Sequence, residues 1–158
     1  MDFASPRIAL TVPRQTAHLA LVRQVVVAAA ARLGFADDDV VKIELATDEA
    51  CANAVVHGAA ADGPPTFELT IEAEEDDLVI TLRDRAAGFS FEDEGRFELA
   101  AKLREQGQGG LGVYIMRSFM DEVTYRREGE VTVTTLRKRR AAAGELVTSG
   151  TGAPHGAA

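Results

Sequence analysis

Glu49 and Asn53 stand four residues apart in the stretch Val40–Gly58, which reads VVKIELATDEACANAVVHG. On a helix this spacing places the carboxylate and the amide on the same face. The residues that flank the pair around the helix are all apolar: Leu45, Val56, Ala46 and Ala50. We therefore expect the pair to point into the body of the domain. Two buried polar side chains are unfavourable unless something polar meets them, so the pair predicts a ligand site.

A second candidate is Asp84, at the end of an alternating segment. Leu78, Ile80 and Leu82 share one face of a predicted strand over residues 78–84, and Asp84 is the next residue on that face. The buried face of the strand thus ends in a carboxylate. Taken by itself, Asp84 is better explained as a cap for the following turn. Together with Glu49 and Asn53 on the helix, however, Asp84 becomes a stronger candidate for a ligand-binding residue.

The third candidate is the glycine-rich segment Gly107–Gly112, GQGGLG, directly before a predicted helix that runs to about Phe119. Glycines before a helix let the backbone approach a ligand, and the helix start offers unpaired N–H groups to an anion. Such segments also form plain turns. The spacing is similar to a dinucleotide fingerprint, but it follows an irregular segment rather than the first strand of a parallel unit. A Walker loop is excluded because no Lys-Ser or Lys-Thr follows the glycines.

Hydrophobic periodicity predicts the elements that must position these groups. Strands are expected over residues 7–12, 66–73, 78–84, 122–127 and 130–138, with a hairpin turn at Glu128-Gly129. Helices are expected over residues 14–33, 37–58 and 113–119, with a short one around 97–103. The tail over residues 141–158 is rich in Gly and Ala and is expected to be disordered.

Length, composition and charge indicate one soluble domain of 158 residues, with 46% hydrophobic and 27% charged residues. The net charge of −8 argues against nucleic acid or an anionic membrane as the main partner. The basic run Arg137–Arg140 is short and is interpreted as the solvated end of the last strand.

Cysteine use and hydropathy indicate the compartment. The single cysteine, Cys51, fits a reducing environment, where it would be a small, partly buried apolar residue. No apolar run is long enough to span a bilayer, and the N-terminus has no secretory pattern. A cytoplasmic location is therefore expected.

Three short motifs, in this order, resemble the N, G1 and G2 boxes of the GHKL ATP-binding superfamily, which includes gyrase, the heat-shock chaperone ATPase, histidine kinases and mismatch-repair proteins. They are Glu49-x-x-x-Asn53, Asp84-x-Ala86-x-Gly88 and Gly107-x-Gly109-Gly110-Leu111-Gly112. Within the superfamily, the small build and the string DEACANAVVHG over residues 48–58 most resemble anti-sigma-factor serine/threonine kinases. The resemblance runs from about residue 8 to residue 138.

The resemblance implies an α/β fold (an α+β two-layer sandwich) with a Bergerat-type mixed β-sheet and helices packed on one face. Residues 1–140 would form one ATP-binding kinase domain. ATP and Mg²⁺ would be its ligands, with Asn53 holding the metal and Glu49 acting as general base. Asp84 would accept a hydrogen bond from the adenine amino group, which selects adenine over guanine.

The resemblance also implies roles for the loops. Gly88 would let the chain turn beneath the base, and residues Gly107, Gly109, Gly110, Leu111 and Gly112 would present backbone N–H groups to the phosphates. Arg104 is a candidate for a phosphate contact from a lid, against the alternative of a solvated arginine. Ala86 departs from the family, which has glycine there; if that position needs a positive φ, alanine adds about 1 kcal/mol of strain.

The function implied is an anti-sigma-factor kinase that phosphorylates a small anti-anti-sigma antagonist protein and sequesters a sigma factor, with homodimers common among such kinases. Two alternatives stay open. One is an ATP-gated regulatory binding module without phosphoryl transfer. The other is a regulatory switch kinase that never binds a sigma factor.

Overall fold

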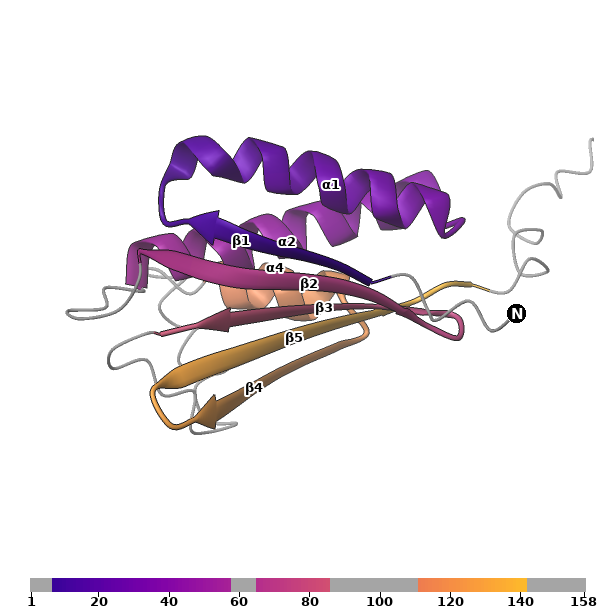
Figure 1. The fold of residues 1–158 in the computed structure, drawn as a ribbon. Coiled ribbons are helices and arrows are strands. Elements are labelled where there is room, and N and C mark those ends of the chain that lie inside the picture. The colour runs from indigo at the N-terminus through magenta and orange to yellow at the C-terminus, as the bar shows by residue number, and fades with distance from the viewer. Residues whose placement is uncertain (1–6, 58–64, 86–110, 142–158) are drawn as a thin grey trace, which may run out of the picture.

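The computed structural model describes residues 7–57, 65–85 and 111–141. They form one five-stranded sheet in the order β1-β2-β3-β5-β4 and a layer of helices (Figure 1). The strands are β1 (Arg7–Pro13), β2 (Thr66–Glu74), β3 (Asp77–Asp84), β4 (Glu122–Glu128) and β5 (Val131–Arg139). The helices are the 3₁₀ turn η1 (Thr16–His18), α1 (Leu19–Arg32), α2 (Asp37–His57) and α4 (Leu111–Phe119).

The two-layer α/β architecture is confirmed, but one detail of the sheet differs from expectation. Every pair of neighbouring strands among the described residues is antiparallel, so the mixed sheet implied by the resemblance is wrong for this part of the chain. The two adjacent pairs β2–β3 and β4–β5 are hairpins, and antiparallel pairing follows directly from their short turns.

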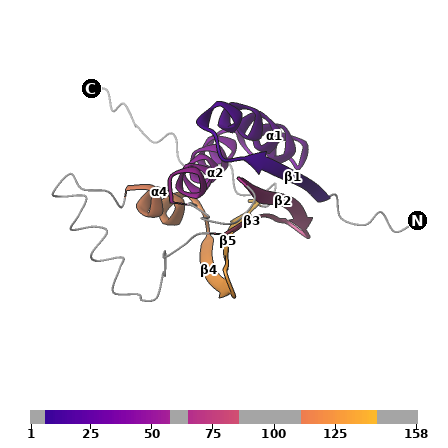
Figure 2. The same cartoon turned by 60° about the vertical axis from the view of Figure 1, so that its left-hand side comes forward.

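The helices lie together on one side of the sheet (Figure 2). The largest fully buried side chains of the core come from both layers: Phe67, Leu69, Leu78, Ile80 and Leu136 from the sheet, and Ile43 and Met116 from α2 and α4. None of the helices in the described ranges is long and apolar enough to cross a bilayer.

The central helix is α2, which packs between α1 and α4 and also touches β3 and β5. Its buried stripe follows the helical period through Ile43, Ala46, Ala50 and Ala54. Thr47 is also buried, and its hydroxyl donates to the Ile43 carbonyl at 2.7 Å. Because most of this stripe is alanine, the neighbouring helices and strands can approach the α2 backbone closely, and a site on its edge is shared by several elements.

The first helix starts five residues later than predicted. Instead of entering a helix, Arg14 continues the line of β1: its backbone N–H donates to the Pro65 carbonyl at 2.8 Å. The 3₁₀ turn then leads into α1 at Leu19. The predicted stop at Gly34 is confirmed, since Gly34 has φ 80° directly after the helix.

The last hairpin turns one residue later than predicted. Glu128 pairs with Val131, so the turn residues are Gly129 and Glu130 rather than Glu128 and Gly129. Gly129 has φ 63°, a conformation that glycine adopts without strain.

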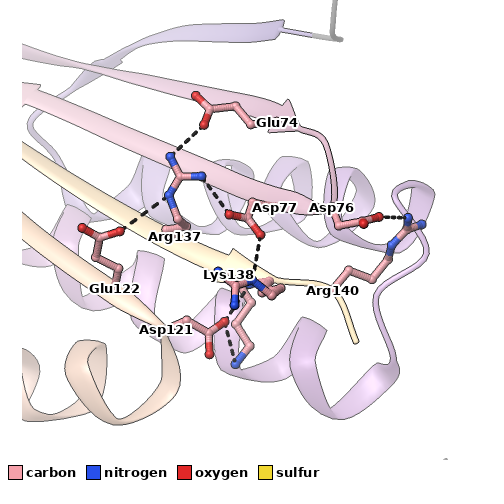
Figure 3. Close-up of polar contacts among 9 residues, drawn as sticks. Glu74, Asp76, Asp77, Asp121, Glu122, Arg137, Lys138 and Arg140 are labelled. Carbon is pink, nitrogen blue, oxygen red and sulfur yellow. Dashed lines mark hydrogen bonds and ion pairs between the residues drawn. The ribbon is translucent and has the colours of Figure 1, made fainter. Parts of the chain in front are cut away.

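The basic run at the end of β5 is held by acidic neighbours rather than simply solvated (Figure 3). Arg137 donates to Asp77 at 2.8 Å and to Glu74 at 2.7 Å, across the hairpin turn between β2 and β3. Arg140 reaches Asp76 at 2.6 Å and the Leu33 carbonyl at 2.9 Å, which ties the end of the sheet to the end of α1. These pairs neutralise much of the run, so the expectation that it is simply solvated is wrong, and its role in the fold is structural.

Candidate functional site

The Glu49 and Asn53 pair lies on α2 at the edge of the core. Both side chains are half-buried. One flank of the pair is buried as expected, with Ala46 and Ala50 inside the core. The other flank is not: Leu45 and Val56 are 45% and 69% exposed. The prediction that the pair points fully into the body of the domain is therefore wrong in degree. The pair therefore borders a solvent-exposed flank of α2.

Gly112, the second residue of α4, lies directly against Glu49. A Cβ atom placed on Gly112 would stand 2.6 Å from Oε2 of Glu49, well inside van der Waals contact. Glycine at this position is what allows α4 to begin beside the carboxylate. The start of α4 carries backbone N–H groups without partners inside the helix, and these suit an anion. The structure thus brings the end of the glycine-rich segment, at Gly112, against Glu49 of α2.

The electrostatics of Glu49 suit proton transfer. Burial raises the pKa of its carboxyl above the ordinary value, and the charge of Asp48 raises this pKa further. Asp48 is itself held by Arg23 of α1 at 3.1 Å, and Arg23 also stands 3.8 Å from Glu44. A carboxylate with a raised pKa is a better general base near neutral pH than an ordinary glutamate.

Asp84 ends the buried face of β3, as the alternation predicts, and is only 5% exposed. Its carboxylate forms a buried ion pair with Arg14. Burial raises the pKa of Asp84, and this effect outweighs the Arg14 charge and the backbone N–H of Arg85, which lower it. A buried carboxylate that still has a raised pKa beside an arginine is unusual for a simple turn cap, and this favours the functional interpretation.

Sequence reasoning missed Arg14. The signal was present, because the alternation of β1 through Leu10 and Val12 puts Arg14 next on the buried face, one step beyond Pro13. The ends of β1 and β3 therefore carry opposite charges on the same face of the sheet. Assigning Arg14 to the first turn of a helix concealed this pattern.

Sequence reasoning also missed Thr132. This residue pairs with Asp84 across β3 and β5, so both side chains lie on the helix-covered face. The Thr132 hydroxyl oxygen is buried and makes no hydrogen bond to the described part of the chain. A buried hydroxyl without a protein partner, next to a buried carboxylate, is the kind of group that a bound ligand or water satisfies.

Several predicted site residues lie outside the described residues: Ala86, Gly88, Arg104, Gly107, Gly109 and Gly110. The predicted short helix over 97–103 and nearly all of the predicted tail over 141–158 also lie outside them. Leu111 is the first residue of α4 and is 52% exposed. His57 is the last residue of α2, and its side chain is among the parts not described.

The side-chain oxygen atoms on α2 could bind a hard cation only together with oxygen atoms from a bound ligand. Asn53 offers an amide oxygen and Glu49 a carboxylate, and oxygen is the ligand atom that Mg²⁺ prefers. Among the described residues no group of three or more His, Cys, Asp or Glu side chains could hold a metal ion. A cation at this edge would need phosphate oxygens and water to complete its coordination, which is how magnesium is commonly held with nucleotides.

Cys51 lies on α2 between Glu49 and Asn53 in the sequence but faces the core. It is 1% exposed, more deeply buried than expected, and burial raises the pKa of its thiol to about 12. A thiol in that state is not a nucleophile at neutral pH. The chemistry of the site therefore rests on oxygen and nitrogen groups.

Comparison with known proteins places the fold and the family. The model of the histidine kinase-like ATPase domain matches residues 12–138. The serine-protein kinase RsbW of Bacillus subtilis is 30% identical over 130 residues, which cover 80% of this chain and 81% of that protein. The serine-protein kinase RsbW of Halalkalibacterium halodurans is 31% identical, over 80% of this chain and 79% of that protein.

Two solved structures share the fold. The RsbU and RsbW domains of Rv1364c from Mycobacterium tuberculosis align with a TM-score of 0.65 at 20% identity, over 90% of this chain. This chain spans 35% of that longer one. The SiaB–SiaC complex from Pseudomonas aeruginosa aligns with a TM-score of 0.61 at 11% identity, over 83% of this chain and 87% of that one. With a family model that matches most of its length and relatives at 30% identity, the chain belongs to the histidine kinase-like ATPase domain family.

Proposed function

We propose that this protein is an ATP-dependent serine/threonine protein kinase of the anti-sigma-factor type. It transfers the γ-phosphoryl group of ATP to a serine of a small antagonist protein. The observation that carries the proposal is the contact between Gly112 and Glu49, which sets a carboxylate of raised pKa against the amino end of a helix. The family and the serine kinases among the relatives support the same activity.

In the proposed reaction Glu49 acts as the general base. Its carboxylate takes the proton of the substrate serine hydroxyl as the serine oxygen attacks the γ-phosphorus, and the bond from that phosphorus to the bridging oxygen breaks to release ADP. The backbone N–H groups at the start of α4, which begins beside Glu49, would hold phosphate oxygens. Gly107, Gly109, Gly110 and Arg104 are proposed to add further contacts to the phosphates.

Asn53 is proposed to hold Mg²⁺. It lies one turn along α2 from Glu49, the proposed general base. A cation held there would supply positive charge that neutralises part of the phosphate charge. The role of Asn53 itself is to present its amide oxygen at a fixed place on a rigid helix. The Asn53 side chain is half-buried and lies on the same face of α2 as Glu49, which supports its proposed role as a metal ligand.

The adenine-binding end of the site is proposed to lie at Asp84 and Thr132. The Asp84 carboxylate would accept a hydrogen bond from the adenine amino group, whereas guanine would place a carbonyl oxygen against it. Thr132 has a buried hydroxyl that lacks a protein partner among the described residues, and it would complete the polar contacts to the base or to a bridging water. Gly88 is proposed to let the chain pass beneath the base.

The partners of the kinase follow from its type. Its substrate is proposed to be an anti-anti-sigma protein, and its regulated partner a sigma factor bound through another face. A homodimer and a cytoplasmic location belong to the same proposal. The single cysteine supports the location, because it fits a reducing compartment. The acidic net charge disfavours nucleic acid as a direct partner.

Incubation with γ-labelled ATP and candidate anti-anti-sigma proteins tests the proposal. Label should reach a serine of the antagonist with the unchanged protein and be lost with Glu49→Gln, which keeps the size of the side chain but removes the base. Binding of ATP without transfer to any candidate would instead indicate an ATP-gated binding module. Transfer without sigma-factor binding in a pull-down would indicate a switch kinase.

A further inference from the structure

Arg14 connects three parts of the chain that are far apart in sequence. Its guanidinium forms the ion pair with Asp84 at the end of β3. It also donates to the Ala54 carbonyl on α2 at 3.2 Å and to the Arg85 carbonyl at 3.3 Å. The side chains of Arg14 and Asp84 are only 8% and 5% exposed. This is the most deeply buried ion pair among the described residues.

The arrangement solves a specific electrostatic problem. A carboxylate at the end of a core-facing strand is strongly disfavoured in its charged form by burial. Arg14 supplies the opposing charge and lowers the pKa that burial raises. Arginine suits the position because its planar fork of N–H groups can hold a carboxylate and two carbonyls at once, which a lysine ammonium on a flexible stem does less well.

We propose that Arg14 is a positioning residue for nucleotide recognition, which keeps Asp84 ionised and correctly oriented for the adenine amino group. This inference rests on the proposed function. Through Ala54, which directly follows Asn53, Arg14 also fixes the distance between the adenine-binding end of the site and the metal-binding end. One side chain outside all three sequence motifs thus couples the two ends.

The contacts favour a permanent support over a latch that the nucleotide must displace. The guanidinium of Arg14 holds two backbone carbonyls, those of Ala54 and Arg85, and its own backbone N–H is bound to Pro65. Adenine can bind to Asp84 without breaking any of these backbone contacts. If Arg14 supports Asp84, replacing it should weaken ATP binding. If Arg14 instead blocked Asp84 and had to be displaced, replacing it should strengthen ATP binding.

The charged surroundings of Asp84 in the described structure are simple. Arg14 provides the facing charge, and Thr132, opposite Asp84 on β5, does not titrate. Arg83 precedes Asp84 but points to the other face of the sheet, where it pairs with Glu128 at 2.7 Å. Arg83→Gln is therefore a matched control: the same substitution, on the neighbouring residue, without contact to Asp84.

The experiment compares ATP and GTP binding by calorimetry for the unchanged protein, Arg14→Gln, Arg14→Lys and Arg83→Gln, from neutral to alkaline pH. Arg14→Gln should weaken ATP binding by about tenfold at neutral pH, the effect of losing one charge-assisted hydrogen bond, and should reduce the preference for ATP over GTP. Because the pKa of Asp84 rises when Arg14 is removed, affinity should recover as the pH increases. Arg83→Gln should match the unchanged protein.

Two further variants keep the test decisive. In an Asp84→Asn background, Arg14→Gln should add little, because both changes act on the same contact. If Arg14→Gln does not fold, Arg14→Lys retains the charge without the fork, and it should weaken ATP binding with no change in pH dependence. ATP binding by either Arg14 variant as tight as that of the unchanged protein, or tighter, would overturn the inference while leaving the kinase proposal intact. Failure of the unchanged protein to bind ATP would overturn both.

Discussion

Gly112→Ala tests the geometry on which the base assignment depends. The added Cβ would lie 2.6 Å from Oε2 of Glu49, whereas ordinary contact begins near 3.4 Å, so the oxygen must retreat by about 0.8 Å. The other atoms that the Cβ would meet lie at 3.5 and 3.7 Å, within normal contact. The strain therefore falls on the flexible end of one side chain. The helix itself should tolerate alanine, which has the higher helix propensity.

The functional effect should be large for so small a change. A displacement of about 1 Å at a catalytic group can reduce the rate by about a hundredfold. We expect phosphoryl transfer to fall by that order, while the melting temperature and ATP affinity change little. Single-turnover transfer from labelled ATP measures the rate, and thermal denaturation measures stability. Ser118→Ala, at an exposed position of the same helix, is the control. Transfer at the unchanged rate in Gly112→Ala would refute the proposed placement of Glu49.

Three further substitutions test other parts of the site. Asn53→Ala should weaken ATP binding by about tenfold or more in the presence of magnesium and have little effect without it; equal affinities with magnesium before and after would contradict the metal role. Asp84→Asn should reduce the preference for ATP over GTP and, because it leaves the Arg14 charge buried without its partner, should destabilise the fold by about 3 kcal/mol in thermal or urea unfolding. Unchanged selectivity would count against the adenine contact. Asp48→Asn removes a charge that raises the pKa of Glu49, so the acidic limb of the rate profile should move to lower pH. A limb that stays in place would show that another group controls it.

The parts of the fold that depend on local periodicity were predictable from sequence. The alternation of β3 placed Asp84 on the core face, and the helical period of α2 put Glu49 and Asn53 on one face. Short-range signals of this kind are set by the chain itself. The same holds for the stop at Gly34, where a positive φ is required.

The parts that depend on distant neighbours were not predictable in the same way. Leu45 and Val56 were expected to be buried because they are apolar, but which side of α2 is covered depends on where α1 and α4 pack. Likewise, Arg14 was assigned to a helix because its partners, Asp84 and the Ala54 carbonyl, lie 70 and 40 residues away. Carrying the alternation of β1 one step beyond Pro13 would have placed Arg14 correctly.

The basic run of β5 shows the same limit. A run of cations near the end of a domain is usually solvated, and only the three-dimensional register brings Arg137 against Glu74 and Asp77. The turn between β2 and β3 is acidic and the end of β5 is basic. Their pairing across the sheet is recognisable from sequence only when the strand order is already known.

Calorimetric titration of the unchanged protein with ATP, ADP and GTP, with and without magnesium, tests the central claim most directly. The account predicts that ATP and ADP bind, that GTP binds much more weakly, and that removing magnesium weakens ATP binding. Equal binding of ATP and GTP, or no binding of ATP with magnesium present, would contradict the assignment of this edge of α2 and the end of β3 as an adenine-nucleotide site.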